Sequence, residues 1–281
     1  MMKIISSLLL LAWSTWLVAA PLQSDISAGL TIDNNITRAE LDRDIEKDNI
    51  LNLDAATAMR LPLNDNSYFS IGASLALNQY LDFTKLSNTR LGVNGSYHIR
   101  PYPGYTSIKY FLQLGYELRM YDSDQREGSA LQYGLGFSKR ITDLIKLLAG
   151  YNKETIDADH VVFEADNKTL YVDAEYKLSA SNRLYLTLSR LDGDIVATTV
   201  PTTKIIQYAS AIVRDDAFLD LTPDRFAYKL SAKTNVIRLG DNYAIDSQQG
   251  VDASVIFYNA SAYGDNDYSG MIINLSYLMR F

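Results

Sequence analysis

The chain has 281 residues, a formal net charge of −7, 47% hydrophobic residues, 20 tyrosines and no cysteine. The acidic balance argues against a nucleic-acid partner, and the lack of cysteine excludes disulfides, thiol catalysis and thiolate metal sites. A membrane-spanning helix needs about 20 consecutive apolar residues. No run of that length follows the N-terminal segment, which excludes a helical membrane protein.

The first twenty residues have the layout of a secretory signal peptide. Lys3 supplies the positive charge, Ile4–Val18 the apolar stretch, and Ala19 and Ala20 the small residues of a cleavage site. A single anchoring helix is the alternative, but four Ser and Thr residues interrupt this short run. We therefore expect residues 1–20 to be removed and residues 21–281 to form one exported domain.

Most of the remaining chain alternates apolar and polar residues, as half-buried strands do. In Ser107–Tyr121, for example, Leu112 and Leu114 share one face, and Gln113 and Glu117 lie opposite. In chain order the predicted strands are Asp25–Asn35, Asn49–Leu63, Tyr68–Gln79, Thr89–Arg100, Ser107–Tyr121, Ala130–Ile141, Leu144–Asn152, Thr169–Leu178, Arg183–Arg190, Arg225–Ile237, Gln249–Ala262 and Tyr268–Phe281.

Short turns and longer polar connections alternate between these strands, which is typical of membrane barrels. The turns are Asn64–Asn66, Tyr102–Gly104, Thr142–Asp143 and Ser179–Asn182, and the longer connections include Ile36–Asp48, Asp122–Gly128 and Glu154–Asn167. The pattern predicts an all-β fold: a transmembrane antiparallel β-barrel of twelve strands with both termini periplasmic. Residues 191–224 contain apolar stretches of their own, and a further hairpin there would give fourteen strands.

The last strand carries its apolar residues at alternate positions, namely Met271, Ile273, Leu275, Tyr277, Met279 and Phe281. This ending resembles the terminal strand of Gram-negative outer-membrane β-barrel proteins. The resemblance implies a location in the outer membrane, with its lipid and lipopolysaccharide as surroundings. It also implies that Tyr277, Met279 and Phe281 form an assembly signal, which the barrel-assembly machinery reads.

Three short patches are similar to barrel domains of surface-lipoprotein export helpers. They are Asp33–Glu40, Gly193–Asp194 and Asp215–Phe218. That resemblance implies a periplasmic helical-repeat domain, for which this chain has no room because its first predicted strand follows the signal peptide directly. The chain would therefore be a barrel without that module.

Charged residues of both signs fall on the predicted inner face of the barrel. They are Arg90, Arg100, Lys109, Glu117, Arg119, Arg140, Asp173, Glu175, Lys177, Lys229 and Lys233. Buried charges must pair or be hydrated, so these residues either form ion-pair ladders or line a water-filled passage. We expect a narrow porin-like channel for small solutes or ions. The alternative is a non-conducting scaffold that engages a surface lipoprotein or another envelope partner.

A lipid-modifying enzyme is a further alternative, because Ser96 and His98 share a strand face. The pair is predicted to lie on the lumen side, and no third group is evident to orient the histidine base, so we expect no catalytic site. Three Asp-rich segments, at residues 157–160, 192–194 and 264–267, lack the spacing of a calcium loop and are explained as turns. We expect no metal and no cofactor.

Overall fold

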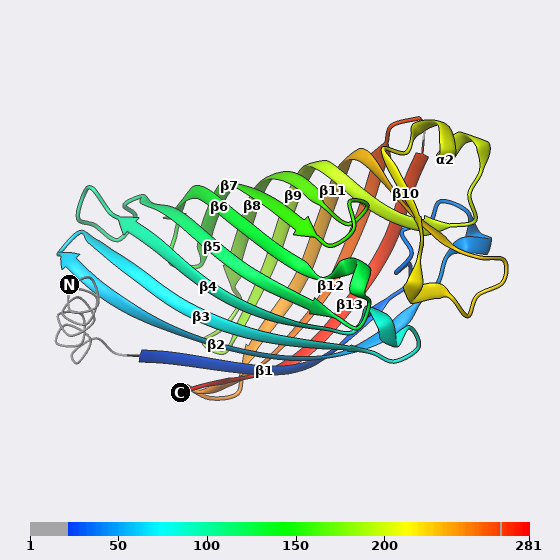
Figure 1. Cartoon of the computed structure of the whole chain (residues 1–281). Helices are drawn as coiled ribbons and strands as arrows, with labels where there is room; N and C mark the ends of the chain where they lie inside the picture. The colour runs from blue at the N-terminus through cyan, green and yellow to red at the C-terminus, as the bar shows by residue number, and fades with distance from the viewer. Residues whose placement is uncertain (1–21, 265) are drawn as a thin grey trace, which may run out of the picture.

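The computed structural model describes residues 22–264 and 266–281 and shows a closed antiparallel β-barrel (Figure 1). The signal peptide expected at residues 1–20 lies outside the described residues. Twelve strands form the wall: β1 (Leu22–Asp33), β2 (Asp48–Asn64), β3 (Ser67–Tyr80), β4 (Asn88–Ile99), β5 (Lys109–Tyr121), β6 (Gly128–Arg140), β7 (Ile145–Ala158), β8 (Ala165–Lys177), β9 (Asn182–Thr199), β11 (Phe226–Ala244), β12 (Gln249–Ala262) and β13 (Asn266–Arg280).

The barrel closes where the first strand pairs with the last. β1 and β13 are antiparallel, with Leu30 opposite Leu275. Phe281, which directly follows β13, exchanges backbone hydrogen bonds of 3.3 and 2.8 Å with Ser24 of β1. Each remaining strand pairs with its neighbours in the chain, apart from β9, which pairs directly with β11. Every long edge is therefore satisfied, as closure of a barrel requires.

The two ends of the barrel differ (Figure 1). Short connections at residues 65–66, 141–144, 178–181 and 245–248 gather at one end together with residues 22 and 281, and we call this the turn end. The longer connection of residues 100–108, between β4 and β5, also lies at this end. Near it, the register of β2 shifts between Pro62 and Asn64, where proline cannot donate to the ladder. Five further connections, at residues 34–47, 81–87, 122–127, 159–164 and 200–225, gather at the other end, which we call the loop end, together with the short connection from β12 to β13.

The strand pairing separates an outer face from an inner one, because directly opposed residues lie on the same face. On β5, Leu112, Leu114 and Leu118 are exposed by 55%, 57% and 45%. They belong to an apolar belt that runs over the outer face of every strand. Gln113 and Glu117 have the opposite parity and point inward. The apolar-out, polar-in pattern is that of a transmembrane barrel, and none of the helices among the described residues is long and apolar enough to cross a membrane.

The prediction of twelve strands is confirmed, whereas several strand ends were placed wrongly. β8 begins at Ala165, four residues before its predicted start. β7, β9 and β11 continue past the predicted ends to Ala158, Thr199 and Ala244. The segment of residues 200–225 contains α2 (Thr203–Tyr208), β10 (Ala211–Arg214) and the 3₁₀ turn η4 (Asp216–Phe218). β10 pairs only with β11, at Phe226–Lys229 beyond the end of β12, so it does not add a strand to the barrel wall.

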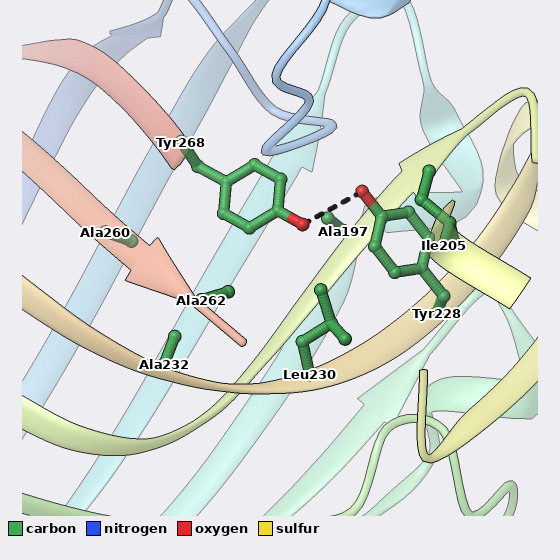
Figure 2. Packing of buried hydrophobic residues seen from close by; sticks show 8 residues of the cluster. All are labelled: Ala197, Ile205, Tyr228, Leu230, Ala232, Ala260, Ala262 and Tyr268. Atoms are coloured by element: carbon green, nitrogen blue, oxygen red, sulfur yellow. Dashed lines mark hydrogen bonds between the residues drawn. The ribbon is translucent and has the colours of Figure 1, made fainter. Parts of the chain in front are cut away.

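Segment 200–225 is anchored to the inner wall at the loop end by a buried apolar cluster (Figure 2). Ile205 of α2 packs against Tyr228 and Leu230 of β11, and the hydroxyls of Tyr228 and Tyr268 lie 3.1 Å apart. Small residues of the wall complete the cluster, namely Ala197, Ala232, Ala260 and Ala262. Three more 3₁₀ turns lie in the other loops: η1 (Asp42–Asp44), η2 (Thr84–Leu86) and η3 (Asp124–Arg126).

Candidate channel lumen

Most of the predicted lumen residues occupy inner-face positions. The strand register places Arg90, Lys109, Glu117, Arg119, Arg140, Asp173, Glu175 and Lys177 there. Arg100 directly follows β4 and is exposed at the turn end. These residues come from β4, β5, β6 and β8, so this predicted set lies on one side of the lumen.

Lys229 and Lys233 do not line the lumen, which corrects the prediction. They share the parity of Ile237 and Leu239, whose side chains are exposed on the outer face by 45% and 50%. The polarity of β11 inverts near the loop end, because its inner face there packs against α2 and is apolar. Alternation alone therefore assigned the faces of this segment the wrong way round.

At the loop end most inner-face charges are paired. The exception is Arg90, which lies opposite Arg119 in the register, forms no ion pair among the described residues and has a buried Nε without a partner. Arg119 forms two ion pairs of 2.7 Å, with Glu117 on its own strand and with Glu154 of β7. Gln132 also donates to Glu154, at 2.8 Å. On the next strand, the carboxylate of Asp173 accepts from Thr187 at 2.6 Å. This group is an ion-pair ladder that stiffens the wall, and two carboxylates compensate the charge of Arg119.

Three loops from widely separated parts of the wall meet at the loop end. Arg126 of η3 forms a 2.7 Å ion pair with Asp215, and Arg225 forms one of 3.1 Å with Asp44 of η1. The amide of Thr198 donates to the carbonyl of Thr37 at 2.8 Å. These loops follow β1, β5 and β9, which stand about a third of the circumference apart in the strand order. Contacts among them therefore cross above the lumen, and we call this arrangement the loop cover.

Beneath the loop cover lies a cavity of about 270 Å³, lined by Arg38, Arg119 and Arg126 together with Asp33 and several aromatic residues. Arg38 has a backbone φ of 52°, which is uncommon outside glycine. Its guanidinium holds Asp33 at 2.8 Å and Tyr258 at 2.7 Å. Burial alone would lower the pKa of Arg38, but Asp33 and Tyr258 outweigh that effect and raise the pKa, so Arg38 stays charged.

The turn end has a different charge pattern. Eight basic side chains lie at or beside inner-face positions near this end, and we call them the basic ring: Arg60, Arg100, Lys109, Arg140, Lys146, Lys177, Arg183 and Arg280. Two of them have carboxylate partners, since Lys146 pairs with Glu175 at 2.7 Å and Arg280 with Asp25 at 2.6 Å. Among the described residues, no ion pair neutralises the other six.

Apart from Glu175 and Asp25, no acidic residue near the basic ring pairs with it among the described residues, and Asp252 of the inner face pairs instead with Arg238 at 3.6 Å. Asp65, Asp143 and Asp246 lie in the turns beyond the strands and are exposed there. Asp246 is already engaged, because its side chain accepts from the backbone amides of Gln248 and Gln249 at 2.7 Å. The inner wall at this end is therefore basic, although the whole chain is acidic. A cavity of about 480 Å³ lies at this end, lined in part by Arg183, Arg280 and Asp25.

Aromatic rings hold part of the basic ring in place. The ring of Tyr68 lies 4.8 Å from the ammonium of Lys109 and 5.7 Å from the guanidinium of Arg60, and Lys109 also donates to the hydroxyl of Tyr68. Arg140 lies over the ring of Tyr105 and donates to its hydroxyl at 2.7 Å. These contacts fix the cations without neutralising them.

Ser96 and His98 form the pair that their spacing suggested, with 2.8 Å between the hydroxyl and Nε2. The other ring nitrogen of His98, Nδ1, is buried without a partner, and the ring stacks on Tyr68 at 4.6 Å. A nucleophilic site needs a third group to orient the base, and within the described part of the chain no side chain bonds to Nδ1 of His98. We therefore assign the pair a place in the packing of the inner wall.

The described residues contain no group of three or more His, Asp or Glu side chains placed to hold a metal ion. The sequence analysis missed Arg60, Lys146, Arg183 and Arg280 as lumen residues. The sequence does indicate them, because each is a basic residue close to a predicted short turn or to the end of the chain. These residues lie at a similar depth in the barrel, and that depth depends on the strand register, which the pattern of a single strand does not give.

By sequence, the chain matches no protein-family model and no curated protein. By structure, it is similar to the COG4313 outer membrane channel from Pseudomonas putida F1, with a TM-score of 0.60, 9% identity, and coverage of 93% of this chain and 95% of that one. The KdgM porin (TM-score 0.43, 8% identity, 92% and 99% covered) and the TodX monoaromatic hydrocarbon channel (0.46, 10%, 92% and 90%) are more distant. The chain thus has the fold of an outer-membrane β-barrel.

Proposed function

We propose that the protein is a narrow porin-like channel of the Gram-negative outer membrane, with its turn end in the periplasm, and that it favours small anions. The observation that carries the proposal is the basic ring around one mouth of a closed barrel with a polar inner wall. Rings of like charge set the ion preference of a pore. Only charges within about 8–10 Å of the solute path act at physiological salt, so the ring outweighs the acidic loops in the passage itself.

Reversal potentials in a salt gradient across a planar bilayer test this proposal. Replacing Lys109, Arg140 and Lys177 together with Gln should shift the selectivity toward cations. Lys139→Gln is the matched control, because Lys139 precedes Arg140 but lies on the outer face, opposite Leu147 of β7. Conductance with unchanged selectivity in the triple variant would refute the role of the basic ring.

The loop cover favours a second candidate, a non-conducting scaffold whose loops or lumen engage an envelope partner. Three loops joined by ion pairs form a rigid surface at the loop end. Such a surface could bind a partner protein as well as restrict a pore. The two functions separate in the same experiment. Barrels that are shown to be folded and yet pass no current would favour the scaffold, and the inner-face charges would then serve the wall alone.

A further inference from the structure

The outer face of the barrel contains a hollow, which a closed wall does not require. It has a volume of about 710 Å³ and spans β6, β7, β8, β9 and β11. Its outward-facing lining is almost entirely apolar, namely Leu135, Phe137, Ala149, Tyr151, Leu170, Val172, Leu188 and Ile237, and Arg190 and Asn235 are its outward polar members. We call it the outer groove. The small side chain of Ala149, between Phe137 and Val172 in the register, leaves part of this space open.

Basic residues border the outer groove on the side of the loop end. On β7, β8 and β9 the first polar outer-face residues above the apolar belt are Lys153, Lys168 and Arg190, and on β11 Lys233 lies one outward position beyond Asn235. The corresponding residues of β12 and β13 are uncharged, Asn259 and Ser269. The basic border is therefore confined to the strands that form the groove.

The carboxylates near this border compensate only part of its charge. Lys153 pairs with Asp166 at 2.9 Å. Asp192 stands between Lys168 and Lys233 in the register. Within the described part of the chain, no ion pair forms to Lys168, Arg190 or Lys233, and all three are exposed. Three cations thus face outward at the level where the apolar belt ends.

We propose that the outer groove binds one phosphorylated, acylated glycolipid of the lipid A class, with an acyl chain in the groove and phosphate on Lys168 and Arg190. An acyl chain matches the apolar lining, and basic residues at the edge of an apolar belt recognise anionic lipid head groups. The charge favours this occupant over a second copy of the chain, because a protein contact would have to bury three unpaired cations. The inference rests on the proposed outer-membrane location, where such lipids form the outer leaflet.

The test titrates refolded protein in nonionic detergent micelles with bis-phosphorylated lipid A and counts bound lipid by native mass spectrometry. Removing two cations, in Lys168→Gln with Arg190→Gln, should weaken binding about tenfold or more. Lys139→Gln, which removes an outer-face cation near the turn end, should leave the affinity unchanged. Ala149→Phe should weaken binding without any change of charge.

A second set of binding measurements uses the wild-type protein alone. Dephosphorylated lipid A with the same acyl chains should bind more weakly, and inorganic phosphate should not compete at millimolar concentration. Equal binding of both lipids, or unchanged binding in the double variant, would overturn the proposal, as would a stable oligomer that covers the groove and excludes lipid. The binding assay does not measure current, so it tests the lipid proposal even if the barrel does not conduct.

Discussion

The face of each residue in the wall determines what a new charge there costs. Leu114 is 57% exposed on the outer face, and Gln113 beside it points inward. Leu114→Arg should lower the free energy of unfolding by roughly 2–4 kcal/mol if the residue lies near the centre of a bilayer, whereas Gln113→Arg should cost much less. Urea unfolding of the two variants in lipid vesicles checks this, and equal losses would contradict the face assignment of β5.

The buried ion pair between Asp44 and Arg225 is a second position where one residue matters. Asp44 has no exposed side-chain surface and Arg225 is 6% exposed, and Thr199 also donates to the carboxylate. Asp44→Asn leaves a buried guanidinium with only Glu46, at 3.8 Å, as a carboxylate partner. The loss of stability should approach about 3–5 kcal/mol, the usual cost of breaking a buried pair.

The loop end also offers a matched control for that variant. Arg214 and Asp224 form a 2.9 Å pair with about half of each side chain exposed, so Asp224→Asn should cost at most about 1 kcal/mol. Thermal unfolding and the rate of proteolysis within residues 200–225 are the measurements. Similar effects of the two variants would mean that the Asp44 pair does not hold the loop cover together.

At the scale of elements, α2 is the most testable part of the loop cover. Ile205 is 6% exposed in the apolar cluster of Figure 2, and its neighbour Ile206 is 62% exposed on the same helix. A carboxylate at position 205 would be buried without a partner, so Ile205→Asp should detach α2 from the inner wall and raise the single-channel conductance. Ile206→Asp should change neither stability nor conductance. Equal conductance of both variants and the wild type would place the narrowest point elsewhere.

Sequence patterns predicted the elements wherever the two faces of a strand differ in the expected sense. β5 and β6 have an apolar outer face and a polar inner face, so strict alternation located them. β9 and β11 were cut short, because above the apolar belt their inner face turns apolar against Ile205 and their outer face turns polar. That inversion depends on a contact with a segment distant in sequence, and local periodicity carries no information about such contacts.

The terminal strand provides a prediction about assembly. Tyr277, Met279 and Phe281 follow the outer-face parity of β13, and Phe281 is 63% exposed. Deleting Phe281 removes a largely exposed side chain, so the free energy of unfolding should change by less than the roughly 2 kcal/mol of a fully buried aromatic. Insertion in cells should nevertheless fall sharply if the barrel-assembly machinery reads this residue. Phe69→Ala, also on the outer face, is the control, and normal insertion without Phe281 would refute the signal.

Across the whole molecule, charge is distributed by depth. Near the loop end most charges are paired through Arg119, Arg126 and Arg225, with Arg90 as the exception, whereas near the turn end six of the described basic residues form no ion pair. The opening of the barrel at the turn end is therefore basic, although the chain as a whole has a net charge of −7. Sequence analysis found residues of both groups but could not separate them, because pairing depends on which strands are neighbours and on their register.

The proposed location is tested on the whole molecule. The wall of a closed twelve-strand barrel offers no free strand edge at which unfolding can start. It should therefore resist detergent until it is heated and migrate faster on gels when unheated. In cells it should fractionate with the outer membrane. Recovery in the soluble periplasm would refute the location, and with it the channel and lipid proposals, whereas the barrel fold itself would stand if the unheated sample still migrated faster.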